Sequence, residues 1–297
     1  MKAETNINNT VREKEDNVAA EVKVSPARIL SFSFISVLWV MPVVISIYNS
    51  FKQSGKVSSD IFSLPSGESF VFLENYGNAL TFGNYPFFLS FIYTLFISVV
   101  STALILLCCS MAAWYIVRVG SLFSKVFYGM CLFSLAVPFQ MVMFTLSSNA
   151  SRFGLDTPFT IPLVYLGYGA GMAIFMFVGF IKSLPYEIEE AAMIDGCGPI
   201  KMYFLVVFPM LRPVTISVGI LELMWIWNDY LLPYLVLDLT KYRTIPIHVQ
   251  YLKGSYGSVD MGASLAVIVM SLVPMMIVYI LCQKHIIKGI AAGAVKG

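Results

Sequence analysis

The sequence is poor in charged residues and in histidine. Of its 297 residues, 12% are charged, 58% are hydrophobic and two are histidine. A soluble domain carries about 25% charged residues, so this composition excludes an ordinary water-soluble fold and favours burial in lipid. The net charge of +2 is too small to indicate nucleic-acid binding, and no stripe of basic and aromatic residues is found.

The sequence also lacks the residue patterns of catalysis and of cofactor binding. His248 and His285 lie too far apart in the expected topology to share a metal, and no Ser-His-Asp, Cys-His or paired-carboxylate arrangement is found. The Gly-Lys pair at Gly55 is followed by Val57 and lacks the upstream glycine of an ATP-binding loop. We therefore expect no enzyme activity, no metal and no cofactor bound by this chain.

The cysteines argue against a disulfide framework, and the N-terminal segment argues against a cleaved signal peptide. The five cysteines form no Cys-x-x-Cys pair and fall in apolar runs or in a loop expected in the cytoplasm, so we expect reduced thiols that serve packing. Residues 1–28 are mostly polar and mixed in charge, unlike the start of a signal peptide. The first apolar run should therefore remain as a membrane anchor.

Six apolar stretches are long enough to cross a bilayer as helices, which requires about 20 residues each. They run from Ile29 to Asn49, Phe87 to Val117, Val126 to Ser147, Pro162 to Ile181, Val214 to Val236, and Gly262 to Cys282. The sequence thus predicts an all-α membrane protein with a six-helix domain over residues 29–284. A polar tail precedes it over residues 1–28, and a second tail follows over residues 285–297.

Basic residues are divided unevenly between the two sides of the expected membrane domain. With the N-terminus placed inside, most of the 19 Lys and Arg residues fall in cytoplasmic segments. This bias predicts a multi-pass protein of the cytoplasmic (inner) membrane with both termini in the cytoplasm.

The loop between the fourth and fifth spans, residues 183–213, predicts a short helix, a break and a second short helix. Ser183 can cap the first helix, glutamates follow where the helix dipole favours them, and Gly196 supplies a left-handed stop. Pro199 begins the second helix, which Pro209 and the proline at position 213 close. Neither helix is long enough to cross a bilayer.

The first of these helices needs a partner, because one of its sides combines apolar and small residues. The residues on that side are Leu184, Ile188, Ala191, Ala192 and Asp195. A helix lying on the inner leaflet is the alternative, but such a helix carries Lys and Arg on its polar face. This helix carries Glu187, Glu189 and Glu190 instead, interpreted as a solvated face, so a protein partner is favoured.

The same loop carries a recognisable motif. Glu190-Ala191-Ala192 is followed after three residues by Gly196, with Phe208-Pro209 downstream. This pattern resembles the cytoplasmic signature of permease subunits of binding-protein-dependent ABC importers, and implies the type I ABC importer transmembrane fold. In that family the loop forms coupling helices that sit in a cleft of the ATPase. The resemblance implies this coupling role for Glu190, Ala191, Ala192, Asp195, Gly196 and Pro209.

The resemblance extends from Glu74 to the C-terminus. Residues 225–230 resemble the fifth-span segment of the carbohydrate group, and residues 283–297 resemble the tail of the maltose-permease type, which enters the ATPase dimer interface. Tyr93-Thr94 departs from the Asn-Thr or Asn-Ser of many relatives. The implied partners are a second homologous permease, a homodimeric ATPase that binds ATP and Mg, an extracytoplasmic solute-binding protein and a sugar.

The fifth span carries candidate substrate residues. Glu222, Trp225 and Asp229 share one helix face, and a carboxylate within a span is costly unless it meets a cavity, a partner or water. Aromatic faces and polar acceptors are what a sugar site requires, so these residues and Asn228 are candidates for the substrate pathway. An interfacial belt of aromatic residues is the alternative.

Three alternatives remain open at this point. In the last outer loop, Gly254, Tyr256 and Gly257 resemble a loop that reaches into the solute-binding protein, but a plain turn has the same composition. A secondary carrier or channel would use Glu222 and Asp229 as a proton or cation relay. A membrane-assembly subunit without substrate is a third class.

Overall fold

The structure is a computed structural model that describes residues 25–81, 85–252 and 260–294, with side chains in the last segment up to Gln283. Within these residues the fold is helical, and the only strand-like pairing is one antiparallel bridge between Lys52 and Phe70. The prediction of an all-α protein is confirmed.

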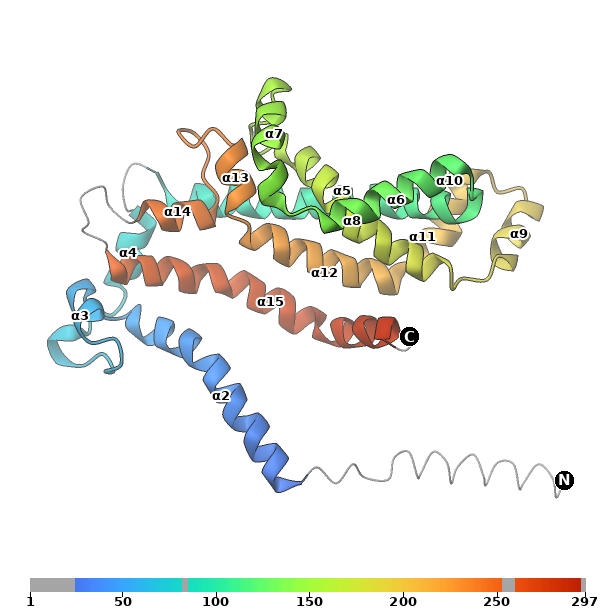
Figure 1. Cartoon of the computed structure of the whole chain (residues 1–297). Coiled ribbons are helices and arrows are strands. Elements are labelled where there is room, and N and C mark those ends of the chain that lie inside the picture. Colours follow the sequence, from blue (N-terminus) through green and yellow to red (C-terminus); the bar gives the residue numbers. More distant parts are fainter. Residues whose placement is uncertain (1–24, 82–84, 253–259, 295–297) are drawn as a thin grey trace, which may run out of the picture.

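Four long helices correspond to predicted spans. They are α2 (Pro26–Asn49), α5 (Phe87–Val119), α8 (Ile161–Ile181) and α15 (Met261–Ala294). Each contains a stretch long and apolar enough to cross a membrane, and the number of such crossings reaches six if two bent helix pairs of the described chain are each counted as one. In Figure 1, α12 (Arg212–Asn228) lies between α8 and α15, whereas α2 diverges from these helices.

The third span is not the unbroken helix that the sequence predicts over Val126 to Ser147. It consists of α6 (Leu122–Ala136) and α7 (Phe139–Arg152), which are bent by 111°. Pro138 lacks a backbone N–H and forces the preceding Val137 into an extended conformation, with φ −84° and ψ 114°. The prediction failed because both halves are apolar, so hydropathy does not register the bend.

The fifth span is also interrupted, contrary to the prediction of one helix from Val214 to Val236. The helix α12 (Arg212–Asn228) ends at Asp229, which is extended with φ −73° and ψ 122°, and α13 (Leu231–Val236) follows. At its other end, α12 meets the preceding helix at 78°. The chain therefore changes direction on both sides of α12.

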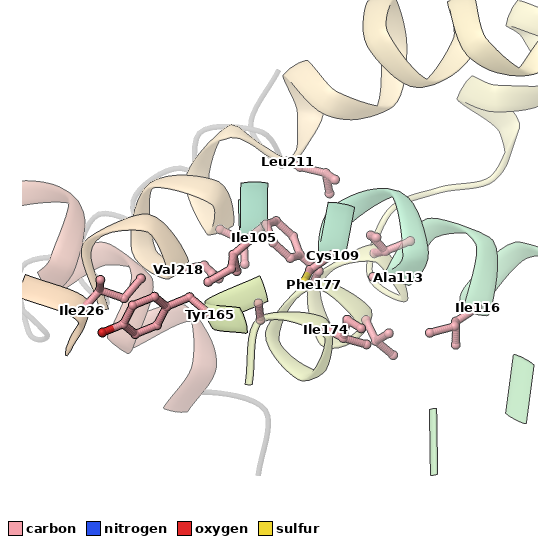
Figure 2. Close-up of a cluster of buried hydrophobic side chains, with 14 of the residues drawn as sticks. Ile105, Cys109, Ala113, Ile116, Tyr165, Ile174, Phe177, Leu211, Val218 and Ile226 are labelled. Atoms are coloured by element: carbon pink, nitrogen blue, oxygen red, sulfur yellow. The ribbon is translucent and has the colours of Figure 1, made fainter. Parts of the chain in front are cut away.

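The core forms where α5, α8 and α12 meet. Figure 2 shows Ile105, Cys109 and Ala113 of α5 with Ile174 and Phe177 of α8, all of them buried. Because lipid is as apolar as these side chains, the helices are held by close packing rather than by escape from water. The five cysteines are all free, as the sequence predicts.

Short helices gather at one end of the bundle. They are α3 (Ser54–Ser59), the 3-10 helix η1 (Gly67–Ser69), α4 (Glu74–Thr81) and α14 (Ile245–Tyr251). Asn75 joins α4 to the segment that follows α2, because its Nδ2 donates to the carbonyl oxygens of Ser50 at 2.8 Å and of Lys52 at 2.7 Å. In Figure 1, α3, α4 and α14 lie at the opposite end from α9 (Glu187–Ile194).

Gly171 sets the approach of α6 to α8. A Cβ at this position would lie 2.5 Å from Ser134 Oγ and 2.9 Å from the Cys131 carbonyl oxygen. We predict that Gly171→Ala lowers the thermal unfolding midpoint in detergent, at a cost of about 1–3 kcal/mol for overpacking. Gly179→Ala is the matched control on the same helix, because the space at Gly179 is open; equal midpoints for the two variants would contradict the prediction.

Candidate functional site

The loop between α8 and α12 has the helix-break-helix form that the sequence predicts. It contains α9, then α10 (Pro199–Met202), a π-helical turn η2 (Tyr203–Val207) and α11 (Phe208–Met210). Gly196 has φ +79°, so it supplies the predicted left-handed residue after α9. Figure 1 places α9 and α10 together at one end of the bundle.

The predicted cap of α9 is wrong. Ser183 does not cap α9, since its hydroxyl donates to the Phe180 carbonyl oxygen at 2.7 Å and the helix begins only at Glu187. The second helix ends between Pro209 and the proline at position 213, as predicted, because its helical path runs from Pro199 to Met210 and turns at Leu211. The π turn before Pro209 widens the helix and accommodates a residue without an N–H.

The motif residues of α9 lie on two different sides of the helix. Glu190, Ala191, Asp195 and Gly196 are exposed, whereas Ala192 is buried and contributes to the core of the bundle. The predicted single docking side is therefore wrong for Ala192. Next to the exposed motif residues, Ile194 is 86% exposed and Ile200 is 75% exposed.

Glu189 is the residue for which the sequence interpretation fails most clearly. The sequence predicts that Glu189 lies on a solvated face, yet this residue is 4% exposed. Its Oε1 accepts from Arg118 Nε at 2.8 Å and lies 2.7 Å from Arg118 Nη2, and its Oε2 accepts from Trp114 Nε1 at 2.9 Å. Both partners come from α5. The available signal was a tryptophan and an arginine four residues apart at the end of an apolar span.

Three of the four substrate-pathway candidates lie together against α8. Glu222 is 2% exposed, and a Cβ built on Gly169 would lie 3.1 Å from its Oε2. The Trp225 ring lies 5.6 Å from the ring of Tyr165, which also contacts Asp229. The predicted shared helix face holds for Glu222 and Trp225, whereas Asp229 follows the end of α12 in an extended conformation and meets α8 through the Tyr165 hydroxyl. Asn228 is exposed, and its Nδ2 donates to the Met224 carbonyl oxygen at 2.7 Å.

Asp229 uses both carboxylate oxygens within the protein. Oδ2 accepts from the Tyr165 hydroxyl at 2.9 Å, and Oδ1 accepts from the backbone N–H of Leu231 at 2.9 Å and of Leu232 at 3.4 Å. The last two bonds satisfy N–H groups at the start of α13. Asp229 thus fixes the turn between α12 and α13 and anchors it to the buried Tyr165 of α8.

Some predicted residues are not placed. Gly254, Tyr256 and Gly257 lie outside the described residues, as does the tail before residue 25. At the other terminus, the backbone of α15 continues as a helix to Ala294, through most of the predicted tail at residues 285–297.

We predict that Asp229→Ala lowers the thermal unfolding midpoint, because the Tyr165 hydroxyl and the Leu231 N–H would lose their acceptor inside the protein. An unsatisfied buried group costs about 1–3 kcal/mol. The neighbouring variant Asn228→Ala is the control, since Asn228 is exposed and bonds only to its own helix among the described residues. A midpoint for Asp229→Ala equal to that of Asn228→Ala would show that the cap does not stabilise the fold.

Comparison with known proteins identifies the family. The family described as "Binding-protein-dependent transport system inner membrane component" matches residues 105–291. The probable starch degradation products transport system permease protein of Thermoanaerobacterium thermosulfurigenes is 34% identical over 262 residues, which are 88% of this chain and 93% of that protein. The multiple sugar-binding transport system permease protein of Streptococcus mutans is 31% identical over 264 residues, which are 88% of this chain and 93% of that protein.

A solved structure shows the same fold. The crystal structure of a bacterial ABC transporter involved in the import of the acidic polysaccharide alginate matches with a TM-score of 0.72 at 21% identity, over 87% of this chain and 94% of that chain. The expected importer fold and the resemblance found in the loop motif are therefore confirmed. The chain belongs to the family of binding-protein-dependent transport system inner membrane components.

Proposed function

We propose that this permease carries a sugar or an oligosaccharide across the inner membrane, driven by ATP that a separate cytoplasmic ATPase hydrolyses. Two relatives that are 34% and 31% identical are named for transport of starch degradation products and of multiple sugars, which supports a carbohydrate substrate. The chain itself does no chemistry. ATP and Mg bind to the ATPase, and this chain converts the motion of the ATPase into alternating access.

The observation that carries the proposal is the exposed surface of α9 and α10. It combines Glu190 and Ala191 of the motif with Ile194 and Ile200, whose side chains are 86% and 75% exposed. Large apolar side chains rimmed by polar groups mark an interaction site. The acidic residues disfavour an anionic lipid surface, so the ATPase is the proposed partner of Glu190, Ala191, Asp195 and Gly196. Ala192 supports this surface from behind, since it is buried in the core of the bundle, and the exposed Pro209 lies near the end of the second helix.

The other partners are assigned by position. The apolar window of α2 is 0% buried within this chain, so lipid and a second homologous permease can cover it. An ATPase homodimer would serve the two permeases. The end of the bundle with α3, α4 and α14 is opposite to α9 in Figure 1, and is proposed to face the solute-binding protein. Gly254, Tyr256 and Gly257, which lie outside the described residues, are proposed to contact the same protein. The end of α15 lies toward α9 in Figure 1, which supports a cytoplasmic C-terminus.

The substrate pathway is proposed to run past Trp225 and Asn228. Trp225 is partly exposed, and its ring meets Tyr165 of α8 edge to face and Tyr168 of α8 in a tilted arrangement. Asn228 is exposed about one turn further along the chain. An aromatic face beside an amide fits the apolar plane and hydroxyls of a sugar. Glu222 and Asp229 act behind this surface, since Glu222 is buried against α8 and both oxygens of Asp229 are occupied.

The secondary-carrier alternative gains no support from this geometry. A proton or cation relay requires carboxylates that ions can reach. Glu222 is 2% exposed, and Asp229 is hydrogen-bonded through both oxygens. Family membership also favours transport that depends on a binding protein.

The test of this function combines isolation and uptake. We expect the tagged chain, purified from its host in mild detergent, to bring a second permease and a soluble ATPase that mass spectrometry identifies. Deletion of the chain should abolish uptake of one member of a panel of labelled malto-, galacto- and xylo-oligosaccharides. Recovery of the chain alone, or uptake that survives ATP depletion but stops when the proton gradient collapses, would overturn the proposal.

Gly196 offers a point test of the coupling surface. Valine is strained at φ +79°, although the space around the position is open, so Gly196→Val should displace α9 without unfolding the spans. We predict that its uptake falls by about tenfold, because a backbone strain of roughly 1–3 kcal/mol shifts the helix. Gly196→Asn should retain most uptake, since asparagine tolerates this conformation. Wild-type uptake by Gly196→Val would remove the assigned role.

A further inference from the structure

One face of α5 holds both helical parts of the coupling loop. Ser110, Trp114 and Arg118 are spaced four residues apart, so they form a stripe along α5. Trp114 and Arg118 bind Glu189 of α9. Ser110 Oγ lies 2.6 Å from the Tyr203 hydroxyl, in the π turn of the second helix. We call these three α5 residues the α5 stripe.

Arg118 contacts α9 and the segment just before it at three positions. Its Nε and Nη2 lie 2.8 Å and 2.7 Å from Glu189 Oε1, and Nη2 also reaches the Leu184 carbonyl oxygen at 3.4 Å. The guanidinium carbon Cζ lies over the Tyr186 ring, 5.3 Å from the ring centroid. The side chains of Arg118 and Glu189 are 18% and 5% exposed. A charge pair this sheltered is screened little by salt.

The second contact of the stripe involves Tyr203. This side chain is 1% exposed, and its ring lies 5.8 Å from the Trp114 ring. Trp114 thus touches Tyr203 through its ring and Glu189 through its Nε1, so one residue joins both helices of the loop. The π turn that carries Tyr203 is a rare feature, and such turns occur frequently at functional sites.

Non-helical residues interrupt both covalent connections of α9. On one side a non-helical segment containing Pro185 joins α9 to α8, and on the other side Gly196 allows a hinge. The α5 stripe bypasses both connections. The helix that carries the stripe, α5, packs against α8 and α12 through the buried core. Because the stripe fixes α9 to α5, a displacement of α9 reaches the helices beside the substrate pathway.

We propose that the α5 stripe is the link through which movement of α9 enters the transmembrane bundle, and that Arg118 and Glu189 are positioning residues for coupling. This inference rests on the proposed function, because it assumes that an ATPase moves α9. Removal of one charge would leave the other without a partner. The guanidinium group is required for its planar fork, which an ammonium group does not reproduce.

The test compares Arg118→Met, Glu189→Gln and the double variant in the complex purified with its ATPase and reconstituted with the host's solute-binding protein. Glu187→Gln is the matched control, since it removes an exposed carboxylate from the same helix. The readout is the ratio of labelled oligosaccharide taken up, using the panel member that the wild type carries, to ATP hydrolysed. Co-purified ATPase and the unfolding midpoint are measured on the same samples.

We expect both single variants to keep the ATPase and to lose about tenfold in this ratio, since the pair acts as a unit. The double variant should lose no more than the worse single variant, and Glu187→Gln should keep the wild-type ratio. If Arg118→Met fails to fold, Arg118→Lys takes its place and should lose several-fold, because it keeps the charge without the fork.

Three results would overturn the link. The first is a wild-type ratio of uptake to ATP hydrolysis in Glu189→Gln together with a wild-type ratio in Arg118→Met or Arg118→Lys. The second is a loss of this ratio in Glu187→Gln that equals the loss in the other variants. The third is a loss of co-purified ATPase that accounts for the whole defect. These differ from a failure of the proposed function, in which the wild-type chain itself brings no ATPase and shows no uptake driven by ATP.

Discussion

The absence of water in the hydrocarbon core constrains the bends within the membrane-spanning part of this chain. A backbone N–H or carbonyl group that leaves a helix there must find a partner within the protein. At the end of α12, the Asp229 carboxylate accepts the N–H groups of Leu231 and Leu232. At the bend between α6 and α7, Pro138 has no N–H to satisfy. The chain therefore bends where a side chain or a proline reduces the cost.

These bends produce the surfaces proposed for coupling and for the substrate pathway. Because α12 ends at Asn228, Trp225 and the exposed Asn228 lie at a helix end rather than inside an unbroken span. Because the chain turns at Leu211, the helix from Pro199 to Met210 does not continue along the α12 axis and can lie against the α5 stripe. The positions of both proposed functional regions thus follow from backbone constraints at the two ends of one helix.

Hydropathy predicts where the helices lie, because a span requires a long apolar run whatever its neighbours are. Its failures at Val126 to Ser147 and at Val214 to Val236 have one physical cause. A bend depends on local backbone chemistry at Pro138 and Asp229, which contributes little to an averaged hydropathy. The loop motif was readable for a similar reason, since Gly196 and the glutamates act through their own helix. The sequence shows Trp114 and Arg118 at the end of an apolar span but does not identify Glu189 as their partner, because the fold brings together residues that lie 71 and 75 positions apart.

The neighbouring glutamates of α9 show how one short helix can serve two partners. Successive residues of a helix point about 100° apart, so Glu189 is directed into the protein while Glu190 is exposed. The 8 residues of α9 would not persist as a helix in water alone, since isolated helices of this length are marginal. Its inward side, fixed by Arg118 and Trp114, supplies the missing stability. The outward side is thereby preformed before any partner binds, so docking need not bear the entropic cost of ordering the helix.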